Sequence, residues 1–197
     1  PYTVKKIKRN SFENNYRLRE IQIPNEVISI GDKAFAGCHG LKNLSLPSKL
    51  NYVGSFEFCK NIKSISLPDS TKDTADGMFT GCEMLTSVKL PRKLKAIKAY
   101  DFADCRKLTK LNIPVTVKVV YMSAFAGSGL KKIVLPSNVQ KIRNGNDGQK
   151  VFEYIKGIGY PTKNLRVIEI HSKKVKSIQK NSFSGLSSKV VIKVPKS

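Results

Sequence analysis

The chain has 197 residues, and its 40% of hydrophobic residues can bury a core, which excludes wholesale disorder. Its 36 Lys and Arg residues outnumber 14 Asp and Glu residues, so the formal net charge is +22. No run approaches the ~18–20 consecutive apolar residues of a membrane-spanning helix, so the sequence predicts no membrane span.

An apolar repeat recurs along almost the whole chain. Its unit is the frame Leu-x-x-Leu-x-Leu followed by proline, with conservative exchanges, as at 18–24, 41–47 and 62–68. Six prolines close these frames at intervals of 21 to 23 residues: Pro24, Pro47, Pro68, Pro91, Pro114 and Pro136. After the proline come two apolar residues three positions apart, then a phenylalanine and, in four units, a cysteine. One unit has Thr71 and Thr74 in place of the apolar pair.

This repeat predicts a solenoid. The alternation at the end of each frame is typical of a strand buried on one face, and proline ends that strand because it cannot donate to a ladder. One turn cannot bury its own apolar face, so successive turns must stack. We therefore expect an α/β-type repeat solenoid, a right-handed superhelix of about eight units of about 23 residues with one parallel β-sheet. In that sheet 41–47 and 62–68 should be neighbouring strands.

The repeat also predicts a single domain over 1–197. Regular repeats fill 2–142, degenerate units with an insertion at 143–162 follow, and a terminal repeat occupies 165–197.

The pattern L-x-x-I-x-[IL]-P-x-x-[VL]-x-x-I-x-x-x-A-F-x-x-C, clearest at 18–38, resembles the BspA-type class of leucine-rich repeat. The resemblance covers 2–142 well and 165–194 loosely. It implies a non-enzymatic protein without cofactors, on a bacterial surface or secreted, that binds or adheres to host or microbial partners. The chain begins at Pro1 without an initiator methionine, so we expect a mature segment from which a signal peptide has been removed.

Phenylalanine and cysteine recur at fixed repeat positions, which predicts two buried columns. We expect Phe35, Phe79, Phe102 and Phe125 to stack in the core. The four cysteines, one per unit, are expected to be buried free thiols: Cys38, Cys59, Cys82 and Cys105. Stacked equivalent side chains point the same way, which disfavours disulfides, and no Cys-x₂₋₄-Cys pair suggests zinc.

Little in the sequence indicates catalysis or metal binding. His39 and His171 are the only histidines, and neither lies in a nucleophile elbow. The acidic cluster at 69–76 lacks the glycine and glutamate of a calcium loop, so we interpret it as a solvated turn. We expect neither an enzyme nor a bound metal.

The exposed positions of the frames form the candidate ligand site. They alternate with buried residues, so they should share the concave face of the solenoid, where a protein or glycan could lie across several units. The candidate residues are small and polar or basic: Lys42, Asn43, Ser45, Lys63, Ser64, Ser66, Ser87, Lys89, Lys110 and Lys132.

Besides a purely structural spacer within a longer surface protein, two alternatives remain open. The first is a polyanion binder, since lysine accounts for 29 of the 36 cations and basic clusters occur at 5–9, 92–95 and 173–176. Cell-wall polymers, sulfated glycans and nucleic acids are the candidate partners, and non-specific attraction to them is expected in any case. The second is a site in the insertion 143–162, with Phe152, Tyr154 and Tyr160 as anchors. We expect a monomer.

Overall fold

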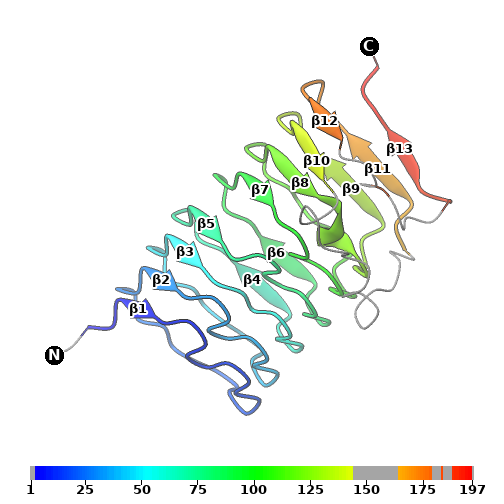
Figure 1. Cartoon of the computed structure of the whole chain (residues 1–197). Coiled ribbons are helices and arrows are strands. Elements are labelled where there is room, and N and C mark those ends of the chain that lie inside the picture. Colours follow the sequence, from blue (N-terminus) through cyan, green and yellow to red (C-terminus); the bar gives the residue numbers. More distant parts are fainter. Residues whose placement is uncertain (1–2, 144–163, 179–182, 184–187, 197) are drawn as a thin grey trace.

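The computed structural model describes residues 3–143, 164–178, 183 and 188–196. In this part of the chain, short parallel strands stack into a solenoid of about seven turns, from the N-terminal rung to the C-terminal one (Figure 1). The predicted parallel-strand solenoid is therefore confirmed. Helix in the described residues is limited to a single 3₁₀ turn, Met122–Phe125.

One row of strands follows the proline position of the units, which is occupied by His171 before the last strand of the row. We call it the post-proline row: β1 (Lys6–Ile7), β2 (Ser29–Ile30), β3 (Tyr52–Val53), β5 (Asp73–Thr74), β7 (Ala96–Ile97), β8 (Val119–Tyr121), β10 (Lys141–Arg143) and β12 (Ser177–Ile178). These strands form two parallel sheets, β1-β2-β3-β5 and β7-β8-β10-β12. The row is thus interrupted between β5 and β7, next to the unit that carries Thr71 and Thr74.

The other row comes from the frames. It contains β4 (Ser64–Ser66), β6 (Ser87–Lys89), β9 (Lys132–Leu135), β11 (Val167–Ile170) and β13 (Val191–Lys193). β4 pairs with β6, and β11 lies between β9 and β13. Figure 1 shows the two rows on opposite sides of the stack.

The expectation of one sheet with a strand from every frame is wrong. Both extended sides of a turn carry backbone groups that only the turns above and below can satisfy, so a second row of strands forms after the prolines. Conversely, the frame segments 18–23, 41–46 and 108–113 form no strand. The segment 41–47 therefore runs beside β4 without pairing with it as a strand.

The core is organised around the predicted aromatic column. The rings of Phe35, Phe56, Phe79, Phe102 and Phe125 are 0–1% exposed, and successive centroids lie 5.8–6.3 Å apart. Their planes diverge by no more than 26°, which is parallel stacking. The predicted stack is confirmed, and Phe12 extends it by one rung.

The four cysteines form a second buried column, and each thiol is a hydrogen-bond donor. Each Sγ lies 3.0–3.1 Å from the carbonyl oxygen of the phenylalanine one rung earlier, as Cys59 does with Phe35. Burial raises the pKa of the thiol groups of Cys59, Cys82 and Cys105. The predicted burial is confirmed, and the thiols link rungs through hydrogen bonds.

A third column controls how closely the rungs approach. Its members follow the phenylalanine by two residues and all have positive φ: Asn14, Gly37, Phe58, Gly81, Asp104 and Gly127. Larger residues and glycines alternate. A Cβ on Gly81 would lie 2.6 Å from Cδ1 of Phe58, and one on Gly127 would lie 2.4 Å from a carboxylate oxygen of Asp104. Each larger side chain therefore lies over the glycine of the next rung.

Candidate ligand-binding groove

The ten candidate residues are all exposed, as the alternation of the frames predicts. Six of them come together in one groove of about 590 Å³ at the N-terminal half of the frame side. These six are Asn43, Ser45, Ser64, Ser66, Ser87 and Lys89. We call the exposed surface of the frame segments the frame face and this depression the frame groove.

The frame groove lies where strand pairing stops. β4 and β6 pair residue by residue, from Ser64 opposite Ser87 to Ser66 opposite Lys89. The segment 41–46 on the other side of β4 is not a strand. The groove extends across this junction, over Leu44, Leu46, Ile65 and Pro68.

The chemistry of the groove is hydrogen bonding over an apolar base. Serine hydroxyls both donate and accept, the amide of Asn43 does both, and the ammonium group of Lys89 only donates. Small side chains leave room for a ligand to approach the backbone. Such a lining can hold the hydroxyls of a glycan or the peptide groups of an extended chain.

The other four candidate residues lie outside the groove. Lys132 is neutralised by Glu169, whose carboxylate oxygen is 2.7 Å from its Nζ atom. The hydrogen bond from Lys132 is the largest effect that holds the pKa of Glu169 below its usual value. Lys42, Lys63 and Lys110 are exposed at other points of the frame face.

The remaining candidate residues of the sequence are dispersed. His39 lies beside the ring of Tyr16, and His171 contacts Glu169 at 3.4 Å. Within residues 3–143, 164–178, 183 and 188–196, no cluster of His, Cys, Asp or Glu side chains could hold a metal ion. The insertion with Phe152, Tyr154 and Tyr160 lies outside the described residues.

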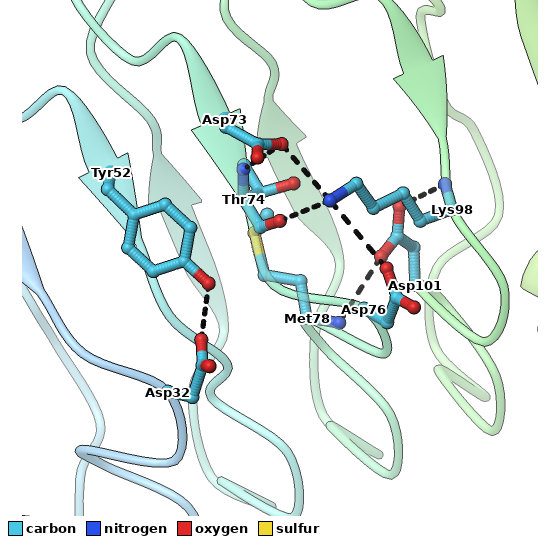
Figure 2. A network of polar contacts seen from close by, with 8 residues as sticks. All are labelled: Asp32, Tyr52, Asp73, Thr74, Asp76, Met78, Lys98 and Asp101. Atoms are coloured by element: carbon cyan, nitrogen blue, oxygen red, sulfur yellow. Dashed lines mark hydrogen bonds and ion pairs between the residues drawn. The ribbon is translucent and has the colours of Figure 1, made fainter. Parts of the chain in front are cut away.

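Sequence reasoning missed a second depression, on the post-proline side. This acidic pocket has a volume of about 370 Å³ and contains four carboxylates, those of Asp32, Glu57, Asp73 and Asp76. The Tyr52 hydroxyl donates a hydrogen bond to Asp32 (Figure 2). Burial, and then the carboxylates of Asp32, Asp73 and Asp76, raise the pKa of Tyr52. Three cations, Arg9, Lys33 and Lys98, also line the pocket, and Lys33 pairs with Glu57 at 3.3 Å, so the four carboxylates are largely balanced.

Lys98 closes this pocket at the interruption of the post-proline row. Its Nζ atom donates to the carbonyl oxygen of Thr74 and lies 3.0 Å from Asp73 and 3.6 Å from Asp76 (Figure 2). Burial alone would lower the pKa of Lys98, but the bond to Asp73 and the charges around it together raise it. The prediction of a solvated turn at 69–76 is right only for its three exposed carboxylates, because Asp73–Thr74 forms strand β5 and Thr71 and Thr74 are buried. The three carboxylates are also ion-paired.

Asp101 accepts hydrogen bonds from two backbone amides beside the interruption of the post-proline row. It is only 4% exposed, and its carboxylate accepts hydrogen bonds from the backbone amides of Lys98 at 2.7 Å and Met78 at 3.3 Å. Burial dominates and raises the pKa of Asp101 to about 7, although both hydrogen bonds act in the opposite direction.

One signal in the sequence could have revealed the acidic pocket. Asp32 and Asp76 both stand eight residues after the proline that closes a frame, so they belong to one column. Tyr52 and Asp73 both stand five residues after such a proline. Comparing these two columns across units predicts that a tyrosine and several carboxylates share one face.

The comparisons with known proteins agree with this architecture. A search of solved structures finds a leucine-rich repeat protein from Bacteroides ovatus, 27% identical, with a TM-score of 0.64 over 99% of this chain and 59% of that one. It also finds a leucine-rich cell surface protein from Faecalibacterium prausnitzii, 28% identical, with a TM-score of 0.72 over 87% of this chain and 44% of that one. The chain therefore spans about half the length of these relatives. No curated protein matches it.

Two further findings bear on the class of protein. Across the described residues, the structure contains no helix of the length and hydrophobicity that crossing a membrane requires. The family model of the BspA-type leucine-rich repeat region, with 6 copies, matches residues 5–128 and 53–157. The repeat fold is in general a binding scaffold rather than a catalytic one. The chain belongs to the BspA-type leucine-rich repeat family.

Proposed function

We propose that the chain is a non-enzymatic binding module that holds an extended protein or glycan ligand along its frame face, in the frame groove. The observation that carries this proposal is the convergence of six exposed polar residues from three frames on one groove of about 590 Å³. A rigid stack of turns holds them in place without a cost of ordering when the ligand binds.

A relative supports a proposal for the cellular setting. The similar protein of Faecalibacterium prausnitzii is a cell surface protein. We infer that the present chain acts at a bacterial surface or after secretion, in adhesion to host or microbial partners. Its length, about half that of the relatives, is compatible with one binding segment of a longer protein.

The test is a screen of the full chain against a glycan array and, separately, an array of extracellular proteins. Ser45→Arg with Ser66→Arg fills the frame groove with two long side chains. Thr109→Arg with Asn112→Arg is the control, because it adds the same charge at exposed positions of another frame. We expect a ligand that the groove variant loses and the control retains.

The expected loss for a true groove ligand is about tenfold or more in affinity, since two buried contacts are replaced by steric overlap. The proposal fails if every ligand of the wild-type chain binds the groove variant and the control equally well. Near-UV circular dichroism of both variants verifies that the fold is retained.

A further inference from the structure

The C-terminal half of the post-proline row carries positive charge and no negative charge. The sheet β7-β8-β10-β12 and the turns that lead into it comprise 92–98, 115–121, 137–143 and 171–178. These segments contain ten Lys and Arg residues and no Asp or Glu. We call their exposed surface the basic face. The N-terminal half of the same row differs, because it contains the acidic pocket.

Backbone hydrogen bonds align lysines of the basic face in one row. The amide of Lys118 donates to the carbonyl of Lys95, that of Gln140 to Lys118, and that of Lys176 to Gln140, each at 2.8 Å. Successive rungs of a parallel sheet lie ~4.8 Å apart, so the row from Lys95 to Lys176 is ~14 Å long. The third position of this row is Gln140, and the next residue in the chain, the exposed Lys141, places a fourth lysine beside the row.

Most cations of the basic face have no anionic partner. Arg92 pairs with Asp69, and Lys98 pairs with Asp73 and Asp76 across the interruption. Within the described residues, no carboxylate lies within ion-pair distance of the remaining exposed lysines: Lys93, Lys95, Lys118, Lys141, Lys173, Lys174 and Lys176. Like charges on neighbouring strands repel.

We propose that the basic face binds a linear sulfated polysaccharide, whose sulfate groups follow the row of lysines. This site is separate from the frame groove and goes beyond the proposed function. A polyanion that follows the row relieves the repulsion between lysines and releases its own counterions. The rigid sheet fixes the spacing of the ammonium groups, so no loop has to be ordered.

The remaining side chains favour a polysaccharide over a nucleic acid. Proteins that bind single strands add aromatic side chains on which bases stack. The described segments of the basic face contain two aromatic rings: the imidazole of His171, which contacts Glu169, and the ring of Tyr121, over which the guanidinium group of Arg143 lies 5.9 Å from the centroid. Arg143 therefore occupies one face of the Tyr121 ring. The free cations are lysines, which bind sulfate as point charges and do not require a planar partner.

The experiment measures binding of a size-defined heparin oligosaccharide to the full chain by fluorescence anisotropy over a series of salt concentrations. Lys95→Glu, Lys118→Glu and Lys141→Glu are combined in one variant. Its control combines Lys6→Glu, Lys49→Glu and Lys107→Glu, three exposed lysines away from the basic face, with the same change in net charge. Single-stranded DNA of equal charge is the second probe.

We expect the variant of the basic face to weaken heparin binding about tenfold or more, against about threefold or less for the control. The slope of log K against log salt should fall in magnitude by about two to three, as expected when three contacts are lost. DNA should bind more weakly than heparin at equal charge and salt.

Three results would overturn the proposal. In the first, both lysine variants weaken binding equally, so that net charge alone is responsible. In the second, DNA binds as tightly as heparin, which makes the surface a nucleic-acid or general polyanion site. In the third, Ser45→Arg with Ser66→Arg abolishes heparin binding, which assigns the glycan to the frame groove. Loss of a groove ligand in that variant with unchanged heparin binding supports both sites independently.

Discussion

The Nζ atom of Lys98 lies 2.6 Å from the carbonyl oxygen of Thr74 and takes the place of a backbone amide. On three earlier rungs the equivalent bond joins two backbones, as from Gly54 to Ile30 at 2.8 Å. At Lys98 the amide turns to Asp101 instead, and the side chain supplies the missing donor. The two halves of the post-proline row are thus joined by side chains at this point.

Lys98→Met should lower the free energy of unfolding by about 1.5–3 kcal/mol, because a charged donor is lost and a backbone acceptor is left without its partner. Lys95→Met is the matched control, since Lys95 is exposed and unpaired, and its effect should stay within about 0.5 kcal/mol. Urea denaturation of both variants measures the difference. Equal effects would show that the bond to Thr74 contributes nothing.

Asp101 should make stability depend on pH. Its pKa is raised to about 7 in the fold from 3.8, so between these values the folded state binds more protons than the unfolded state. Stability should therefore fall as pH rises from about 4 to 7. Compared with Asp101→Asn, which cannot titrate there, the wild-type chain should lose about 2 kcal/mol between pH 5 and 8. A constant difference between the two proteins over this range would contradict the shifted pKa.

Thr71→Val should stabilise the chain by about 1 kcal/mol. Thr71 is 1% exposed, its hydroxyl has no hydrogen-bond partner, and valine or leucine stands at this position in other units. Thr116→Val should have the opposite effect, because that hydroxyl donates to the carbonyls of Arg92 and Leu94. Chemical denaturation of both variants gives the signs, and destabilisation by Thr71→Val would refute the argument.

The alternating column predicts coupling between Phe58 and Gly81. Gly81→Ala should destabilise the chain both through its positive φ and through the collision of the new Cβ with the ring of Phe58. In a Phe58→Ala background only the strain of the backbone remains. A double-mutant cycle should therefore give a coupling of about 1 kcal/mol, and additive effects would exclude the collision.

The thiols should be protected in the native state. Cys38, Cys59, Cys82 and Cys105 are buried, and burial raises the pKa of each thiol, so little thiolate is available at neutral pH. Titration with a thiol reagent should find almost no fast-reacting group before denaturation and four afterwards. Rapid reaction of the native chain, or fewer than four groups after denaturation, would contradict this prediction.

Some features were predictable because one repeat position has the same structural environment in every unit. The phenylalanine and cysteine columns follow from periodicity alone, and so does the exposure of Ser45, Ser64 and Ser66. The post-proline strands were not predictable in this way. Their buried residues are three apart, as Val27 and Ile30 are, and this spacing does not show the period of two that marks a strand.

The sites were predictable only in part. The frame groove forms because strand pairing stops between the segment 41–46 and β4. Whether two neighbouring rungs pair depends on how closely their backbones approach, and the sequence of one rung alone does not show this. The bond from Lys98 to Thr74 is similar, because it exists only where the regular backbone bond fails. Such features arise from differences between neighbouring units, which a consensus averages away.

The column of Asn14, Gly37, Phe58, Gly81, Asp104 and Gly127 sets a rule for how such a chain can grow or shrink. Duplicating or deleting one unit would bring two larger side chains, such as Asn14 and Phe58, or two glycines into register. Exchanging two units at once preserves the alternation. A doublet of units is therefore the smallest insertion or deletion that keeps this column in register, and it changes the length of the frame face without disturbing the stack.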